Sequence, residues 1–201
     1  METTQTSDQV LNAATRLFAA NGYEGTSLTD IAKEVGIRKP SLLYHYNSKD
    51  DLRLAVLRRV FEHWNNELPK ILQAATGHNR FDGLVVAAME FFVSNPDRAR
   101  LLLREMLDRP EELRAQMTAY LAPWLTIIND YIEKGKQAGS VRADIDSEAF
   151  VFQVIQMIIG GVATAAALSG VDAGVTLERH TQEIVRIART SLFIDQDNTD
   201  G

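Results

Sequence analysis

The sequence predicts an all-α protein of about nine helices, with a three-helix helix-turn-helix domain over residues 1–50 and a helical body over residues 51–201. Apolar residues recur every three or four positions along most of the chain. No segment alternates apolar and polar residues with a period of two, and no internal repeat is present. Capping residues and glycines mark helix ends at short intervals. With 45% hydrophobic and 24% charged residues among 201, the chain is long enough to form a sizeable core.

The first helix is predicted to run from about residue 8 to residue 21. Ser7 or Asp8 can cap its N-terminus, and Gly22 suits the left-handed position after its C-terminus. Its apolar stripe has the spacing of one helix face: Val10, Ala14, Leu17 and Phe18.

Two short helices follow, over about residues 28–46. Ser27 caps the first of them with Asp30 three residues later, and Gly36 ends it. Pro40 stands in the first turn of the second, where its missing N–H costs no hydrogen bond. Two short helices joined by a tight turn that contains glycine have the order of a helix-turn-helix motif, which also occurs in plain helical bundles.

The fourth helix is predicted to begin after Ser48 and to run into the body. Asp50 and Asp51 lie in its first turn, where the helix dipole favours negative charge. Its apolar side contains Leu52, Val56, Val60 and Trp64.

Helices of the body are recognised by their capping sequences. Ser94-Asn95-Pro96-Asp97 opens one, and Asp108-Arg109-Pro110 opens a long one that ends near Gly139. Two more are predicted near residues 148–169 and 177–193. The stretch 149–171 contains no charge and is long enough to span a bilayer. Polar interruptions and acidic flanks favour a buried helix, and no membrane partner is expected.

The charges are distributed unevenly along the chain. The formal net charge is −6, yet residues 1–59 carry eight Lys or Arg against seven Asp or Glu. Residues 60–201 carry thirteen against twenty, whereas residues 33–59 carry seven against three. A locally basic segment joined to an acidic body is typical of a module with its own anionic partner, although a solvated helix face gives the same pattern.

The basic segment has the side chains needed to bind double-stranded DNA. If the helix over 39–46 lies in a major groove, its N-terminal side chains face base edges and its flanks face phosphates. Arg38, Lys39 and Ser41 then have base-reading chemistry, and Leu43 can meet a thymine methyl or a sugar. The other predicted DNA-binding residues are Thr26, Ser27, Thr29, Pro40, Tyr44, His45 and Lys49. Under the alternative interpretation the cations are plain surface residues and the aromatics are core, which we accept for Leu42 and Tyr46.

The segment from Leu11 to Leu57 strongly resembles the N-terminal domain of the tetracycline-repressor (TetR) family of transcriptional regulators. The resemblance rests on ungapped spacing of Gly22-Tyr23, Thr26-Ser27, Asp30-Ile31-Ala32, Val35-Gly36, Tyr44-His45 and Ser48-Lys49. Arg38, Pro40 and Leu43 depart from the family's usual Ser or Thr, Gly and Tyr. The resemblance implies a homodimeric repressor that binds a palindromic operator and is released by a small apolar or amphipathic effector.

Aromatic residues and methionines are abundant in the body, which favours an effector cavity there. At helical spacing such residues are more often plain core. The predicted cavity residues are Trp64, Met89, Phe92, Met106, Tyr120, Trp124, Gln156 and Met157.

A homodimer is expected through the last two predicted helices. Small residues in the uncharged helix allow close approach of a second helix, and that helix needs a partner surface. The predicted interface residues are Gly160, Gly161, Ala165, Ile184 and Ala188.

Other functional classes find little support in the sequence. Cysteine is absent, so disulfides are excluded, and the N-terminus lacks the features of a signal peptide, which favours the cytoplasm. No catalytic or nucleotide-binding motif is present, and the histidines at 45, 63, 78 and 180 are not spaced as metal ligands, so no cofactor or metal is expected. A helical-bundle enzyme or a protein-interaction adaptor remains the alternative.

Overall fold

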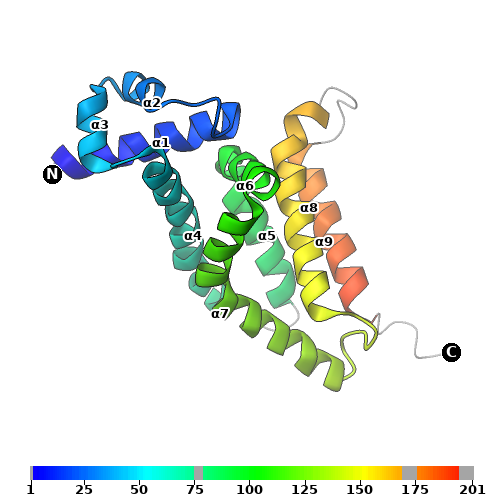
Figure 1. Ribbon diagram of the computed structural model, residues 1–201. Coiled ribbons are helices and arrows are strands. Elements are labelled where there is room, and N and C mark those ends of the chain that lie inside the picture. Colours follow the sequence, from blue (N-terminus) through cyan, green and yellow to red (C-terminus); the bar gives the residue numbers. More distant parts are fainter. Residues whose placement is uncertain (1, 75–78, 169–175, 195–201) are drawn as a thin grey trace.

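The computed structural model describes residues 2–74, 79–168 and 176–194, which form nine helices and no β-strand (Figure 1). The all-α prediction is therefore confirmed. The helices are α1 Glu2–Asn21, α2 Leu28–Val35, α3 Lys39–His45, α4 Lys49–Ala74, α5 Asn79–Val93, α6 Pro96–Asp108, α7 Pro110–Gln137, α8 Ser147–Leu168 and α9 Leu177–Leu192.

Helices α1, α2 and α3 form a reader domain at one end of the molecule, and α4 runs from it into the body (Figure 1). The side chains of Phe18, Ile31 and Leu42 are buried at its centre together with Leu52 and Leu57 of α4. The predicted capping box is present, because Ser27 accepts a hydrogen bond from the backbone of Asp30 while the Asp30 carboxylate accepts one from Ser27 N. Gly36 then takes the left-handed conformation, with φ 75°.

The predicted start of the first helix is wrong. Helix α1 begins at Glu2 rather than after Ser7 or Asp8. No glycine or proline interrupts residues 3–8, so the helix can extend to the N-terminal side. The Ser7 hydroxyl instead shares a hydrogen bond of 2.9 Å with the Tyr46 hydroxyl, at the end of α3.

In the body, α6 packs against both α1 and α8, and α8 and α9 run side by side at the edge far from α3 (Figure 1). Helix α7 bends in its middle, where Pro123 lies inside the helix (Figure 1). Proline removes one backbone hydrogen bond and clashes with the preceding turn, which is a common cause of such a bend. An isolated β-bridge between Val141 and Phe193 ties the end of α9 to the loop after α7.

Helix α8 is less buried than its composition predicts. Within the described residues, Ser147–Ala167 is the one helix long and apolar enough to cross a membrane, with a mean hydropathy of 1.8. Only 28% of that window is buried inside the protomer, so the prediction of a buried helix is wrong for the single chain. One uncharged face of α8 is left uncovered: Gln153, Gln156, Thr164 and Ala167 are exposed, and Gly160 lies between them.

Candidate nucleic-acid interface and effector cavity

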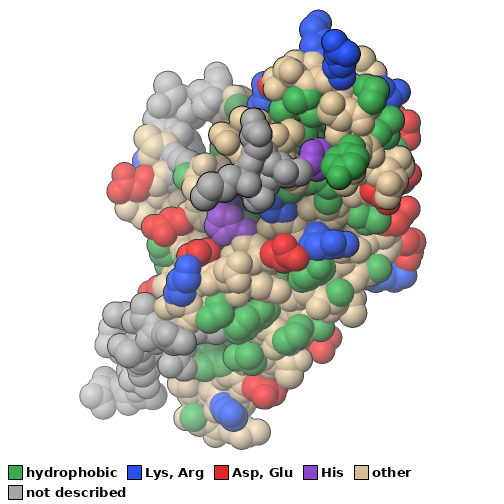
Figure 2. Space-filling model, turned by 90° about the vertical axis from the view of Figure 1, so that its left-hand side faces the viewer, with side chains coloured by type: hydrophobic (Ala, Val, Ile, Leu, Met, Phe, Trp, Pro, Cys, Tyr) green, Lys and Arg blue, Asp and Glu red, His purple; other side chains and the backbone are tan. Residues whose placement is uncertain are grey.

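Helix α3 presents a polar and basic surface to solvent. Arg38, Lys39, Pro40 and Ser41 are exposed at its N-terminal end, and Tyr44 is 84% exposed. Figure 2 shows Lys and Arg side chains projecting from the end of the molecule that carries α2 and α3. Such a surface can insert into the major groove, because its N-terminal side chains extend away from the protein.

The underside of α3 holds the helix in place. Leu42 is fully buried, and the carbonyl of Arg38 accepts hydrogen bonds from the backbone of Ser41 and Leu42 at 2.9 and 3.2 Å. Arg38 adopts an extended backbone with no side-chain capping bond, so the departure from a Ser or Thr cap leaves this helix without one. Within the described residues, Arg38 and Lys39 form no ion pair.

Helix α2 contributes less than the sequence predicts. Ser27 and Thr29 are exposed, but the Ser27 hydroxyl is already bonded to the Asp30 carboxylate at 2.6 Å. Hydrogen bonds from Ser27 lower the pKa of Asp30, so a negative charge persists at this helix end. A phosphate approaching α2 therefore finds Thr29 more available than Ser27.

Thr26 does not belong to this surface, and its prediction as a phosphate contact is wrong. The side chain is 2% exposed. Its hydroxyl donates to the carbonyls of Leu17 and Gly22, at 3.1 and 2.9 Å. Thr26 thus joins the end of α1 to the start of α2 from the inside.

The remaining predicted DNA-binding residues are partly covered. Leu43 and His45 are half-buried, and the His45 ring meets Tyr44 edge-on with 5.6 Å between centroids. The Lys49 ammonium lies 4.0 Å from the centre of the Tyr23 ring, at the start of α4. This cation–π contact fixes Lys49 at the helix N-terminus, where an anion is favoured.

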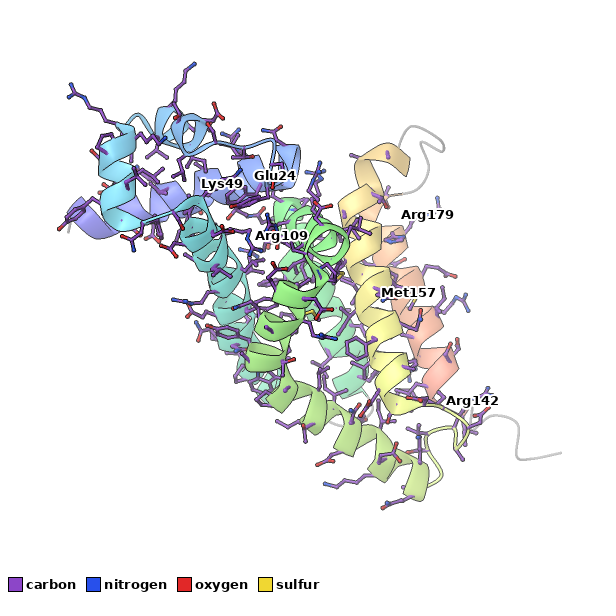
Figure 3. All side chains as sticks on the ribbon, viewed as in Figure 1. Glu24, Lys49, Arg109, Arg142, Met157 and Arg179 are labelled. Atoms are coloured by element: carbon purple, nitrogen blue, oxygen red, sulfur yellow. The ribbon has the colours of Figure 1, made fainter. Side chains whose placement is uncertain are left out.

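Tyr23 is the centre of a cluster of cations at the junction between reader domain and body. The Arg109 guanidinium carbon lies 4.1 Å from the same ring, and that of Arg53 lies 5.7 Å from it. Arg109 also pairs with Glu24 at 3.4 Å. Figure 3 shows Glu24, Lys49 and Arg109 converging at this junction from the loop after α1, from α4 and from the α6–α7 connection. Burial and the neighbouring Asp50 carboxylate raise the pKa of Tyr23, so its hydroxyl stays neutral.

A buried ion pair joins α4 to α6 beside this cluster. Arg53 Nη1 donates to Glu105 Oε2 at 2.6 Å, and both side chains are at most 5% exposed. Burial raises the pKa of Glu105, and Arg53 opposes that effect. The next residue back, Arg104, donates to the carbonyls of Ala19 and Ala20 at 2.9 Å each, which caps the last turn of α1. Helix α6 is therefore tied to both α1 and α4.

A small apolar cavity of about 50 Å³ lies where α4, α5, α6, α7 and α8 meet. Trp64, Phe92 and Met106 line it, as the sequence predicts. The other lining residues, which the sequence did not single out as a set, are Val60, Phe61, Phe91, Leu102, Met117, Leu121, Ile155 and Ile159. Phe91 and Met117 belong to the abundant aromatics and methionines of the body, and that abundance is the one sequence signal pointing to them.

The other five predicted cavity residues do not line this space. Met89 is buried elsewhere in the core, and Met157 is half-buried against it. Tyr120 stacks on Phe61, with 5.8 Å between ring centroids, and Trp124 Nε1 donates to Asn65 at 2.9 Å. Gln156 is exposed on the outer face of α8, so its prediction as a polar group inside the cavity is wrong.

Three of the predicted dimer residues face the interior of the protomer. Ile184 and Ala188 are buried at 3% and 1% exposure, because α9 packs this face against α5 and α8. Gly161 lies against His180, and an added Cβ there would overlap the imidazole ring. Gly160, in contrast, faces open space, and Ala165 is half-buried. The prediction is therefore wrong for Ile184, Ala188 and Gly161 as outward-facing contacts.

No group of three or more His, Asp or Glu side chains suited to a metal ion occurs in the part of the chain that the structure describes.

Two family models match the chain. The model of bacterial regulatory proteins of the tetR family matches residues 10–56, which contain α2 and α3. The model of the tetracyclin repressor-like C-terminal domain matches residues 102–181, which contain most of the body after α5.

Known proteins of related sequence and fold are regulators. The biofilm operon icaADBC HTH-type negative transcriptional regulator IcaR of Staphylococcus epidermidis is 28% identical over 144 residues, covering 72% of this chain and 75% of that protein. The fatty acid degradation regulator FadR of Bacillus halodurans has a TM-score of 0.73 at 17% identity, over 92% of this chain and 94% of that one. A transcriptional regulator from Saccharomonospora viridis in complex with choline has a TM-score of 0.73 at 20% identity, and the match covers 95% of this chain and 99% of that one.

Proposed function

Since the chain belongs to the tetR family of bacterial regulatory proteins, we propose that it is a cytoplasmic repressor whose homodimer binds a palindromic operator and releases it when a small molecule enters the body. The proposal that the protein binds DNA rests on the surface of α3. Arg38, Lys39 and Ser41 are exposed there, and the buried Leu42 anchors the helix. The related IcaR is a negative transcriptional regulator, which supports repression as the activity.

Two copies are needed because a single short α3 reads only a few base pairs. A two-fold dimer presents two such helices about 34 Å apart, one turn of DNA. The uncharged outer face of α8 supports this assembly, since it belongs to a helix with a mean hydropathy of 1.8 that is only 28% buried, and Gly160 leaves room for close approach. A second copy of the chain covers this face better than lipid would. Acidic residues such as Asp146 and Glu148 lie at the start of the helix, where a membrane anchor favours Lys or Arg.

Release by an effector is supported by the position of α6. Met106 of α6 lines the apolar cavity. The adjacent Glu105 holds Arg53 of α4, and Arg104 holds the end of α1. A ligand that displaces α6 therefore acts on both helices that carry α3. Such a ligand must bind the form with low DNA affinity more tightly, by a coupling of about 1–3 kcal/mol.

DNA binding is tested by selecting sites from a random double-stranded library with the full chain. We expect a palindrome with half-sites one helical turn apart. Lys39→Ala should weaken binding to the selected site more than to scrambled DNA, because Lys39 faces the groove floor. Lys49→Ala should weaken both equally and reduce the salt slope by about 0.9, the value of one phosphate contact. Equal loss on both DNAs for Lys39→Ala would remove that residue from base reading.

The dimer is tested by a matched pair of substitutions. Thr164 of α8 and Thr126 of α7 are both exposed, and each donates its hydroxyl to the carbonyl four residues earlier. Thr164→Arg should give monomers in sedimentation, because a bulky, unpaired charge would enter the uncharged interface. Thr126→Arg should remain dimeric. A dimeric Thr164→Arg protein would exclude this face of α8 as the interface.

A further inference from the structure

A groove on the surface of the body adjoins the apolar cavity. It has a volume of about 320 Å³ and lies between the end of α6, the first half of α7 and Phe152 of α8. Met106 and Met117 line both the groove and the cavity. The two hollows are therefore separated by the side chains of these two methionines.

Methionine is well suited to open such a wall. Its unbranched side chain has three rotatable bonds and changes shape at little cost. The cavity alone, at about 50 Å³, is far smaller than the roughly 300–1,000 Å³ of small-molecule sites, and the groove, at about 320 Å³, lies at the lower end of that range. Rotation of Met106 and Met117 would join the two spaces into one elongated site.

The polar groups of this site lie at its outer end. The cavity is lined by apolar residues throughout. In the groove, Arg114 and Thr118 stand one helical turn apart on α7 among apolar neighbours. Arg114 pairs with Glu111, but both side chains are 72% exposed, and an exposed pair of this kind is weak. An acidic group on a ligand can therefore replace Glu111 as the partner of Arg114.

We propose that groove and cavity form one binding site for an unbranched alkyl chain with an acidic head group, such as a fatty acid. The alkyl chain of the ligand passes between Met106 and Met117 and ends beside Trp64. The acidic head group stays at Arg114 and Thr118. This inference rests on the effector half of the proposed function and specifies its ligand. Displacement of Met106 by the chain would act directly on α6, next to the Arg53–Glu105 pair.

The orientation of the bound alkyl chain is tested by quenching of tryptophan fluorescence in the full-length protein without DNA. The sequence has two tryptophans, so Trp124→Phe leaves Trp64 as the single reporter. Dodecanoic acid brominated at its terminal carbon should quench Trp64 strongly, because the heavy atom ends beside the ring. The same acid brominated next to its carboxyl should quench weakly. Equal quenching by both, or none at saturating acid, would overturn the proposal.

The head group is tested by calorimetry with dodecanoic acid and dodecanol. Arg114→Gln should weaken binding of the acid by about fivefold, the upper end for an exposed ion pair, and leave the alcohol unchanged. Arg142→Gln is the matched control, since Arg142 is also an exposed arginine with its own carboxylate partner, Asp144 (Figure 3). Equal loss for acid and alcohol, or equal loss in the control, would overturn the assignment of Arg114.

The methionine wall is tested by Met106→Ile and Met117→Ile, which replace a flexible side chain by a stiff one of similar size. Both should weaken acid and alcohol alike. Met89→Ile is the control, because Met89 is buried but lines neither hollow. Equal weakening in the control would overturn the route. These measurements need no operator DNA. If the fatty acid fails to bind but another compound releases the protein from its operator, this inference is wrong and the proposed function stands.

Discussion

The junction between reader domain and body differs in kind from the interior of the body. At the junction, polar side chains meet specific partners: the buried Thr26 bonds two carbonyls, the buried Arg53 pairs with the buried Glu105, and the exposed Arg104 caps α1. Around the cavity, every lining side chain is apolar. Hydrogen bonds and ion pairs hold one geometry, because a small displacement leaves a buried polar atom unpaired. Apolar contacts are not directional and can be rearranged at lower cost.

In the proposed effector response, this difference would give the two regions different roles. The body interior would change shape to admit a molecule, and the junction would pass a movement of α6 to α1 and α4, because its polar contacts hold these helices together. Substitutions should therefore be costly for opposite reasons in the two places: loss of a partner at the junction, and change of volume in the interior.

The largest effect is expected at the buried ion pair. Arg53→Met alone should lower the free energy of unfolding by about 3–5 kcal/mol, because it leaves the buried Glu105 carboxylate without its partner, whereas Glu105→Leu should cost less, because Arg53 keeps its ion pair with Asp50 at 3.6 Å. The double variant should recover most of that loss, since two apolar side chains replace the pair. Denaturant unfolding of the four proteins measures this. Single variants that cost no more than an exposed pair such as Arg186–Glu183 would show that the junction is not held by this contact.

A smaller effect separates two neighbouring valines of α4. Val60 lines the cavity, whereas Val56, one turn earlier, is buried at 1% exposure and does not. Val60→Ile should raise stability by about 0.8 kcal/mol, because the added methylene fills empty space. Val56→Ile should lower it by about 1–3 kcal/mol through overpacking. Thermal unfolding of both variants checks the pair, and equal changes would mean that the cavity offers no usable room.

The smallest effect is expected for a pair of substitutions that distinguishes a structural threonine, Thr26, from a predicted DNA-binding one, Thr29. Thr26→Val should cost about 1 kcal/mol, the worth of a typical buried hydrogen bond, without changing the salt dependence of DNA binding. Thr29→Val, at an exposed position, should leave stability unchanged and weaken DNA binding. Unfolding curves and salt titrations of operator affinity measure both. A reduced salt slope for Thr26→Val would restore Thr26 to the interface.

Local signals in the sequence predicted the reader domain well. Ser27, Asp30 and Gly36 specify the ends of α2 through contacts within a few residues, and Pro40 marks the first turn of α3. The fold class and the family follow from such signals. Thr26 was misassigned because its burial depends on the packing of its loop against Leu17, nine residues earlier on α1.

Contacts between helices of the body were harder to predict. Met89 and Met106 are both apolar residues at helical spacing, and only the rotation of five packed helices decides that Met106 borders the cavity. Periodicity likewise reveals that Ile184 and Ala188 share an apolar face, but not whether that face meets its own protomer or a second one. The sequence identifies the helices of the body, while the functional positions emerge from their packing.

The bend at Pro123 divides α7 into an N-terminal arm and a C-terminal arm. Its N-terminal arm contains Met117 and borders both hollows. Its C-terminal arm leads to the bridge between Val141 and Phe193, which fastens it to α9. With one backbone hydrogen bond missing at the bend, the angle between the two arms is less constrained than in a continuous helix. A guest in the proposed site would thus press on the first arm of α7 and on α8, which also lines both hollows, while the second arm stays fastened to α9.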